Sequence, residues 1–579
     1  MRILVNKRIV FFFAAYLLVG CTAKGGSKPE AGVASETSHY AAVTSMGRQA
    51  VASVNPIATH AGIKTFERGG NAIDAALAVA FTLGVVDGHN SGIGGGCFIL
   101  ARLATGDIIA LDGREMAPGA AHRDMYLVNG QVDKSLSKTG PLAAGIPGSV
   151  AAFAELQRRG GNLDFSSVLL PAADIAERGF AVDRTFAKRL AGKVEDISRF
   201  PATAKILLND KGQALSTGDI LVQKDLASAY RKLAKHGADW FYQGEFANKT
   251  EQWMKANGGI ITADDFANYK LVEREPVKTD YLGFSIYGFP PPSSGGVHVA
   301  QILGMLSHFQ LNTIDEVERN HLIAEVMKRA FADRAHWLGD PDFAPVPKGL
   351  IDTDYLEKLA KSIDRAVAAP SIEHGVPPNS DTQLFDRHTT HIATADADGN
   401  WVAITTTLNT SFGSKVVVPG TGVILNNQMD DFSAKPGTGN AYRLVGAEAN
   451  SIAPGKRPLS SMSPTIVTRE GQPVVTLGAA GGPTIISQVV QTLIRYLALG
   501  QPIDEAVAGQ RVHHQWMPNL LFIEPSFSEE TRVGLQSKGH DLKVLGSFGG
   551  TQAIAQGETS LLPVTEPRVI LRNESDESE

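Results

Sequence analysis

Two neighbouring runs in the middle of the chain alternate between apolar and polar positions, a pattern that predicts paired β-strands. They lie between residues 389 and 413, in the segment TTHIATADADGNWVAITTTLNTSFG. In the second run, one face is formed by Val402, Ile404 and Thr406 and the other by Ala403, Thr405 and Thr407. The Asp-Gly-Asn step between the runs is typical of a tight reversal. We therefore predict a β-hairpin whose short strands lie inside a sheet.

Hydrophobic periodicity predicts further elements elsewhere in the chain. Residues 71–86 are apolar on most faces, which favours a buried core helix over a membrane span. Amphipathic periodicity predicts helices over residues 149–159 and 320–338. Residues 474–477 are expected to form a buried strand that runs through glycine residues into a helix over about residues 485–499.

The composition is that of a large globular protein. With 579 residues, of which 43% are hydrophobic and 20% charged, the chain can bury a substantial core. Its formal net charge of −6 gives no basic footprint, which argues against nucleic acid as a partner. The acidic end, ESDESE, is interpreted as a solvated tail.

The N-terminus has the pattern of an export signal. Lys7 and Arg8 precede an apolar run, residues 9–20, that is short for a bilayer span and suits a signal-peptide core. The run leads into Leu-Val-Gly-Cys, which resembles the bacterial lipobox, so Cys21 is predicted to be lipidated. Residues 1–20 would then be a lipoprotein signal and residues 21–39 a tether to the bacterial cell envelope, outside the cytoplasm. The alternative is an ordinary secretory signal with a chance cysteine.

The beginning of the hairpin offers an unusual nucleophile. A threonine hydroxyl is weak unless a base is beside it, and a free α-amine on the same residue, with a pKa of about 7.7–8, supplies that base. Thr389 has such an amine only if the bond between His388 and Thr389 is cut. The preceding residues, 368–388, are predicted to form a loop, which would expose that bond. A lone threonine in a strand is more often a simple strand former, so the prediction depends on the surrounding motifs.

Motifs on both sides of the hairpin resemble those of one enzyme family. They are FERGGNAIDAALAVAF at 66–81, LDGREMAP at 111–118, PPPSSGGVH at 290–298, NNQMDDFSAKPG at 426–437, KRPLSSMSPT at 456–465 and GAAGGPT at 478–484. Together they resemble the γ-glutamyltransferases, also called glutathione hydrolases, which belong to the N-terminal nucleophile hydrolases. The resemblance covers nearly all of the chain after residue 40. Ala393, where the family usually has a small hydroxyl residue, and the C-terminal EPRVILRNESDESE depart from it.

This resemblance implies an α+β fold, a four-layer αββα sandwich of the N-terminal nucleophile hydrolase type. It implies self-cleavage between His388 and Thr389 into a large subunit, residues 40–388, and a small subunit, residues 389–579, which form one catalytic heterodimer. The implied activity is cleavage of the γ-glutamyl amide of glutathione and other γ-glutamyl compounds through an acyl-enzyme on Thr389. Water, amino acids or peptides would accept the acyl group, and neither a cofactor nor a metal is implied.

The family's motifs also imply which residues catalyse the reaction. Thr407 is implied to hydrogen-bond the catalytic threonine, and it is expected to share a face with Thr405 and Asn409. Gly481 and Gly482, at the predicted strand-to-helix junction, are implied to form the oxyanion hole. Backbone N–H groups at a helix N-terminus are suited to that task, although a Gly-Gly pair alone is more often a turn.

A γ-glutamyl donor carries an α-carboxylate and an α-ammonium, so its pocket needs a fixed cation and a fixed anion. The resemblance implies that Arg114 is the cation, because a guanidinium can hold a carboxylate in a bidentate contact. It implies that Asp431 is the anion, although either residue taken singly is usually part of a surface ion pair. The other implied substrate residues are Ser460 and Ser461 beside the carboxylate, Asn409 and Gln428 beside the ammonium, and Tyr442 as a lid.

Other chemistries have less support. The sequence contains no G-x-S-x-G elbow, no H-E-x-x-H and no zinc-type spacing of Cys and His. The adjacent His513 and His514 point apart on a strand or a helix, so they are interpreted as structural, and Cys97 as a small apolar core residue. Two alternatives remain: a related cephalosporin or glutaryl acylase, which would not need Asp431, and an inactive lipoprotein that keeps the fold as a binding module.

Overall fold

The computed structural model describes residues 43–370, 372–377, 390–435, 448–546 and 548–574. All of them belong to one compact unit, Tyr40–Glu579. The predictions for Cys21, His388, Thr389 and Tyr442 fall outside the described residues.

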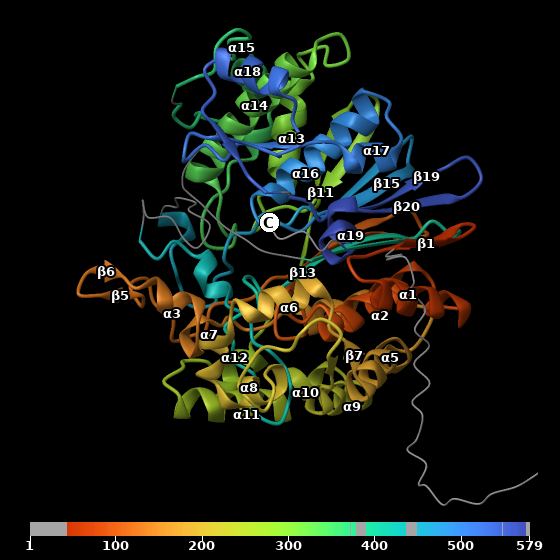
Figure 1. Ribbon diagram of the computed structural model, residues 1–579, viewed down its shortest axis with the longest axis vertical. Coiled ribbons are helices and arrows are strands. Elements are labelled where there is room, and N and C mark those ends of the chain that lie inside the picture. Colours follow the sequence, from red (N-terminus) through yellow and green to blue (C-terminus); the bar gives the residue numbers. More distant parts are fainter. Residues whose placement is uncertain (1–42, 371, 378–389, 436–447, 547, 575–579) are drawn as a thin grey trace, which may run out of the picture. The chain divides into compact units, whose positions relative to one another are not determined.

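Two antiparallel sheets lie face to face in this unit (Figure 1). Among the described residues, the first sheet has seven strands in the order β1 (Val43–Met46), β2 (Gln49–Ala52), β12 (Thr390–Ala395), β13 (Trp401–Thr407), β3 (Gly96–Arg102), β4 (Ile108–Gly113) and β9 (Val272–Arg274). The second has six strands there, in the order β10 (Val277–Tyr281), β11 (Phe284–Gly288), β14 (Thr465–Arg469), β15 (Gln472–Gly478), β19 (Gln552–Gln556) and β20 (Leu561–Thr565). Strands β12 and β13 contact β15, and β2 contacts β20, so the two sheets pack directly on each other.

Helices cover the outer face of each sheet (Figure 1). Helix α2 (Ala72–Val86) packs against β12 and β13, and α4 (Ser149–Gly160) packs against β3 and β4. On the other side, α13 (Gly295–Leu306) packs against β10 and β11, and α16 (Thr484–Leu493) against β15. The predicted four-layer αββα sandwich is confirmed.

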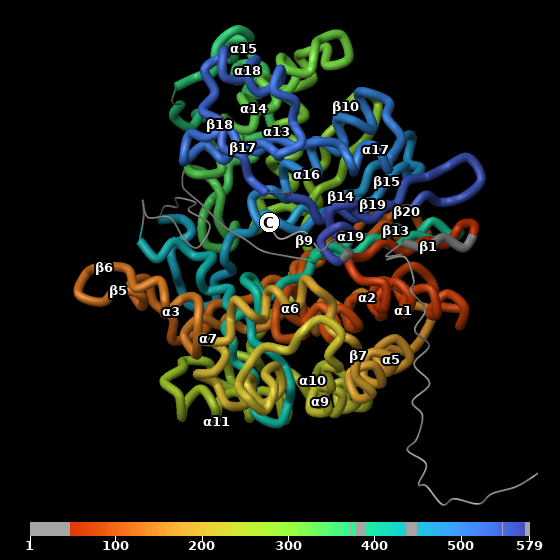
Figure 2. The backbone as a smooth tube through the Cα atoms, viewed as in Figure 1, coloured from red at the N-terminus to blue at the C-terminus, as the bar shows by residue number. Residues whose placement is uncertain are grey.

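The remaining described elements connect or surround these layers. In chain order they are α1 (Pro56–Glu67), β5 (Leu127–Val128), β6 (Gln131–Val132), α3 (Lys134–Lys138), η1 (Pro141–Ala143), α5 (Phe165–Arg178), β7 (Phe180–Ala181), α6 (Arg184–Ala191), α7 (Val194–Ser198), α8 (Pro201–Leu207), β8 (Ile220–Leu221), α9 (Lys224–His236), α10 (Ala238–Tyr242), α11 (Glu245–Ala256), α12 (Ala263–Ala267), α14 (Glu316–Trp337), η2 (Lys348–Ile351), α15 (Thr353–Lys361), η3 (Gln428–Asp431), η4 (Glu448–Asn450), η5 (Ile494–Ala498), α17 (Ile503–Ala508), β16 (Val512–His513), β17 (Leu521–Ile523), α18 (Glu529–Ser537), β18 (Leu542–Val544) and α19 (Pro567–Glu574). The last helix, α19, contacts α6, a helix nearly 400 residues earlier in the chain (Figure 2). None of the helices in the described ranges is both long enough and apolar enough to span a bilayer.

The predicted hairpin is confirmed as β12 and β13, with Thr390 opposite Thr406. Both of its faces are buried. Ile404 belongs to the core shared with α2, whereas Ala403 packs in a small apolar cluster that includes Ile466 of the second sheet. The hairpin is thus buried between a helix layer and a sheet layer, which explains the scarcity of charge in its sequence.

Helix α2 has the expected position and burial. Its N-cap Asn71 accepts hydrogen bonds from the backbone N–H groups of Ile73 and Asp74, and the Asp74 side chain accepts one from the backbone of Asn71. This reciprocal capping fixes the beginning of the helix. All of its residues are buried, as the apolar pattern predicted.

The prediction of an amphipathic helix over residues 320–338 is wrong about burial. Helix α14 (Glu316–Trp337) is buried on nearly every face from Asn320 onward. Its charged residues are compensated internally, since Glu325 lies 2.7 Å from both Lys328 and Arg329. Charged side chains at helical spacing therefore indicated buried ion pairs here rather than a solvated face.

The predictions for residues 474–499, for Cys97 and for the two adjacent histidines are confirmed. The strand predicted at 474–477 is β15, and the helix predicted near 485–499 is α16 followed by the π-helical turn η5. Cys97 is buried in the core, and burial raises the pKa of its thiol well above the usual value. Both adjacent histidines are buried, with His513 bonded to Ser487 and His514 to Asn519.

Candidate active site

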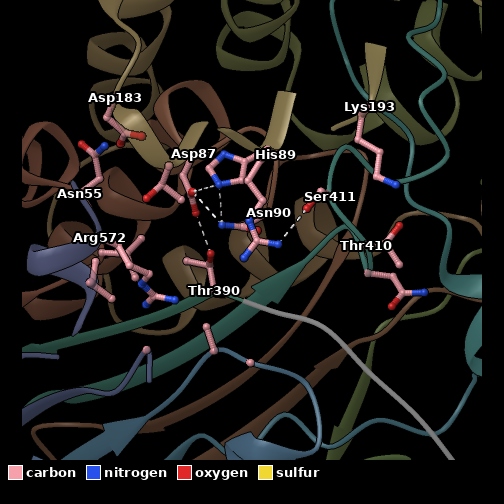
Figure 3. A pocket seen from close by; sticks show the side chains of 18 of the residues that line it. Asn55, Asp87, His89, Asn90, Asp183, Lys193, Thr390, Thr410, Ser411 and Arg572 are labelled. Carbon is pink, nitrogen blue, oxygen red and sulfur yellow. Dashed lines mark hydrogen bonds and ion pairs between the residues drawn. The ribbon is translucent and has the colours of Figure 1, made fainter. Parts of the chain in front are cut away.

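Thr390, the first described residue of the hairpin, is bound to the end of helix α2. Its Oγ1 donates a hydrogen bond to Oδ2 of Asp87, the C-cap residue of α2, at 2.7 Å (Figure 3). Asn90 Nδ2 donates to the other carboxylate oxygen at 2.9 Å. Burial raises the pKa of Asp87 to about 7, against the opposing effect of the bond from Thr390. The residue after the predicted nucleophile is thus held by a carboxyl group that titrates near neutral pH.

A cavity of about 570 Å³ adjoins this contact. Two of the predicted site residues, Asn409 and Gly481, line it together with Thr390. Figure 3 shows Asp183 on one side of the pocket and Lys193 on the other. The described lining does not include Arg114, Gln428, Asp431, Ser460 or Ser461. The predicted residues therefore form two groups, one on this cavity and one outside its lining.

The turn between β15 and α16 has backbone angles that favour glycine. The φ angle is 125° at Gly481 and 66° at Gly482, in the region that side chains with a Cβ rarely adopt. Gln488 Nε2 donates to the carbonyl of Ala480 at 2.8 Å, and Thr484 Oγ1 donates to the carbonyl of Gly481 at 2.6 Å. These bonds hold the turn in place at the beginning of α16, where peptide dipoles favour a negative charge.

The backbone N–H groups of this turn are not used by the part of the chain that the structure describes. No described residue accepts a hydrogen bond from the N–H of Gly481 or Gly482. Two such donors beside a helix N-terminus can stabilise an oxyanion.

The chain leaves the sheet directly after Thr407. Asn409 has φ 76°, and its backbone N–H donates to Thr407 Oγ1 at 2.8 Å. The expectation that Asn409 shares a strand face with Thr405 and Thr407 is therefore wrong, because the alternation of side chains ends with β13. Asn409 Nδ2 instead donates to the carbonyl of Asn427 at 2.9 Å, which ties the end of the hairpin to the segment before η3.

Arg114 and Asp431 form a fully buried ion pair. Arg114 Nη2 donates to Asp431 Oδ2 at 2.5 Å, and both side chains are 0% exposed. The guanidinium also donates to the carbonyl oxygens of Pro458 and Leu459 at 3.0 and 3.2 Å. Gln428 Nε2 donates to the same carboxylate oxygen of Asp431 at 2.6 Å. The two residues that the sequence assigned to opposite charges of one ligand thus contact each other.

A second carboxyl group lies beside this pair. Glu115 Oε2 is 3.5 Å from Arg114 Nη1, and both side chains are fully buried. Burial raises the pKa of Glu115 to about 7, although the charge of Arg114 opposes the shift. Arg114 therefore lies between two acidic side chains.

The two predicted serines have different surroundings. Ser460 Oγ accepts a hydrogen bond from the backbone N–H of Met462 at 3.1 Å. Ser461 Oγ accepts one from Arg334 Nη2 at 2.5 Å and lies 3.1 Å from Ser294 Oγ. The buried helix α14 thus positions Ser461 through Arg334, which explains why that helix carries a buried arginine.

Several residues of this region were not found from the sequence. Glu115 was within reach of the argument, because it follows Arg114 directly in the REMAP motif. Asp87, Arg334 and Gln488 gave no comparable signal, since each acts through a partner distant in the chain or through backbone atoms. Thr390 was part of the Thr-Thr-His signature, but its partner Asp87 is 303 residues away.

Comparison with known proteins gives a consistent result. The family model described as "Gamma-glutamyltranspeptidase" matches residues 58–572. The "Glutathione hydrolase proenzyme" of Escherichia coli is 41% identical over 525 residues, which cover 90% of this chain and 90% of that protein.

Two solved structures are also similar. A cephalosporin acylase from Bacillus halodurans has a TM-score of 0.82 at 28% identity, covering 93% of this chain and 97% of that one. A γ-glutamyltranspeptidase from Helicobacter pylori has a TM-score of 0.55 at 38% identity, covering 56% of this chain and 95% of that one.

Proposed function

Since this chain belongs to the γ-glutamyltranspeptidase family, we propose that it is a self-processing γ-glutamyltransferase and glutathione hydrolase. The observation that carries the proposal is the buried pair of Arg114 and Asp431. A γ-glutamyl donor presents one carboxylate and one ammonium on the same carbon. A fixed guanidinium and a fixed carboxylate in contact can exchange their mutual ion pair for two ion pairs with that group. Without the donor, neither buried charge lacks a counter-charge, which avoids a large desolvation cost.

In the proposed maturation step, the Thr389 hydroxyl attacks the carbonyl of His388. The His388 carbonyl carbon forms an ester bond with the hydroxyl oxygen, and its bond to the nitrogen of Thr389 breaks. The hydroxyl proton moves to that nitrogen, which becomes a free amine. Water then cleaves the ester, which releases the His388 carboxylate and the threonine hydroxyl. The exposed α-amine becomes the base for catalysis. The relative of E. coli is named a proenzyme, which supports this maturation.

In the proposed catalytic cycle, Thr389 Oγ attacks the γ-carbonyl of the donor. The hydroxyl proton passes through the α-amine to the leaving nitrogen, the amide bond breaks, and a γ-glutamyl ester forms. Water or the amine of an acceptor then breaks the ester and returns a proton to Thr389 Oγ. Gly481 and Gly482 are proposed to bind the oxyanion in both halves, with Thr407 hydrogen-bonding the catalytic threonine. Asn409, Gln428, Ser460 and Ser461 are proposed to complete the donor pocket, with Tyr442 as its lid.

A related acylase is the second candidate, and the similarity to the cephalosporin acylase supports it. The donor's α-ammonium separates the two activities, because a glutaryl group has none. Purified protein should therefore hydrolyse γ-glutamyl-anilide much faster than glutaryl-anilide. A preference for the glutaryl substrate would favour the acylase, and no hydrolysis of either by a cleaved sample would favour an inactive binding module.

We also propose that the mature protein is attached to the bacterial envelope by lipid on Cys21, outside the cytoplasm. The proposal depends on the lipobox-like sequence and on the polar segment that follows it. One acyl chain anchors a protein only marginally, whereas two or more hold it firmly.

A further inference from the structure

The cavity of about 570 Å³ beside Thr390 is bounded by two distant parts of the chain. Thr185 and Arg189 come from helix α6, and Val569 and Arg572 come from the C-terminal helix α19. The two helices contact each other, and Asn573 Oδ1 accepts a hydrogen bond from the backbone N–H of Thr185 at 3.1 Å. Helix α19 includes the end of the chain that departs from the family pattern.

Cationic side chains predominate among the charged residues of the cavity. Its described lining has five basic side chains, Lys138, Arg189, Lys193, Lys415 and Arg572, and three acidic ones, Asp87, Asp183 and Asp196. The acidic groups already have local roles. Asp87 accepts from Thr390, Asp183 accepts from the backbone N–H of Phe186 as the N-cap of α6, and Asp196 is 3.9 Å from Lys193. The cavity therefore favours an anionic ligand.

Arg189 is a cation of the cavity lining with few competing contacts. Its Nη1 donates to Ser411 Oγ at 3.3 Å, and no carboxylate of the described residues lies within 4.0 Å of its guanidinium. The charge of Arg189 acts on groups near Thr390, because it lowers the pKa values of both Asp87 and His89. Burial has the larger effect on both of these pKa values. A planar guanidinium that has no carboxylate partner among the described residues can bind the carboxylate of a ligand through two parallel hydrogen bonds.

We propose that Arg189 binds the carboxylate of the amino acid or peptide that leaves from, or is joined to, the γ-glutamyl group. This inference rests on the proposed function, in which Thr389 precedes Thr390 at one end of the cavity. The donor's own α-carboxylate is assigned to Arg114, which does not line the cavity among the described residues. Arg114 thus binds the α-carboxylate of the γ-glutamyl group of a substrate such as glutathione. Arg189 binds the carboxylate on the other side of the scissile amide.

The test compares glutathione with glutathione amidated at its glycine carboxylate, using the full-length processed enzyme. The measured quantity is the ratio of their kcat/KM values for hydrolysis. Loss of one charge-assisted contact is expected to make the wild-type ratio about tenfold to a hundredfold in favour of glutathione. In Arg189→Ala the ratio should fall towards one, and in Arg189→Lys it should be intermediate, because an ammonium cannot reproduce the fork.

Lys188→Ala is the matched control, since Lys188 is an exposed cation on the same helix and is not in the described lining of the cavity. It should keep the wild-type ratio. A wild-type ratio near one, or an unchanged ratio in Arg189→Ala, overturns the assignment of Arg189. An equal fall in Lys188→Ala overturns it as well, because the effect would then come from the general charge of α6. Hydrolysis of γ-glutamyl-anilide, whose leaving group has no carboxylate, tests the proposed function independently of Arg189.

Discussion

Replacing Asp431 by Asn tests the donor pocket most directly. The substitution keeps the shape of the side chain and removes the charge that lies 2.5 Å from Arg114. A γ-glutamyl donor would then place its ammonium in a buried site without a counter-charge, which typically costs about 2–5 kcal/mol. That cost corresponds to a loss of about thirtyfold to several-thousandfold in kcat/KM for γ-glutamyl-anilide. Glutaryl-anilide, which has no ammonium, should be a poor substrate of wild type and nearly unaffected by the change.

The structure also predicts how the same change affects stability. Removing one partner of a buried ion pair typically costs about 3–5 kcal/mol. Arg114 nevertheless keeps the Glu115 carboxylate at 3.5 Å and two backbone carbonyls, so Asp431→Asn should fall at or below the lower end of that range. Arg114→Met should cost more, because it leaves two buried carboxyl groups without their shared cation.

The assay combines kinetics on processed protein with thermal or urea unfolding of each variant. Glu357→Gln is a suitable control, because Glu357 forms an exposed pair with Lys361 at 2.6 Å and should change neither measurement. If Asp431→Asn is correctly processed and hydrolyses γ-glutamyl-anilide at the wild-type rate, the assignment of Asp431 to the ammonium is refuted and the acylase becomes the better candidate.

Three further predictions follow from the sequence and the structure. Mass spectrometry of mature protein should find a fragment that begins at Thr389 and is absent in Thr389→Ala; an intact but active wild type would contradict the maturation step. Cys21→Ser should release the protein from the membrane fraction or stall its maturation, and unchanged retention with normal maturation would count against the lipid anchor. Asp87 has its pKa raised from 3.8 to about 7 by burial, so the folded state binds the proton more tightly and the contribution of Asp87 to wild-type stability falls as pH rises through that window. Asp87→Asn has no carboxyl group to titrate at this position. In urea unfolding, the free energy of unfolding of wild type minus that of the variant should therefore decrease by up to about 4 kcal/mol between pH 4 and 8. A difference that stays constant with pH would contradict this prediction.

Local patterns predicted much of the fold. The hairpin and helix α2 were found because alternation and a continuous apolar run are properties of neighbouring residues. The burial of α14 was missed because its charges find partners inside the helix and on Ser461, which is 127 residues from Arg334. Sequence spacing alone cannot distinguish such a helix from one with a solvated face.

The site shows the same division. The family motifs led to Arg114 and Asp431, which the structure brings into contact although they are 317 residues apart. The motifs did not indicate that the two side chains neutralise each other, because this depends on the paths of two loops. The cavity beside Thr390 was also not predicted, since it forms where α6 and α19 meet.

The order of strands in the first sheet has a consequence for the cleaved protein. Strands β12 and β13, which follow the proposed cut, lie between β2 and β3, which precede it. Backbone hydrogen bonds therefore join the two products of cleavage along both sides of the hairpin. Separating them would break the hydrogen bonds of two strand pairs and expose the apolar surface between the sheets. The two products are therefore expected to stay associated after the peptide bond is cut. The proposed cleavage can thus create a new N-terminus at the reaction centre without dissociation of the two subunits.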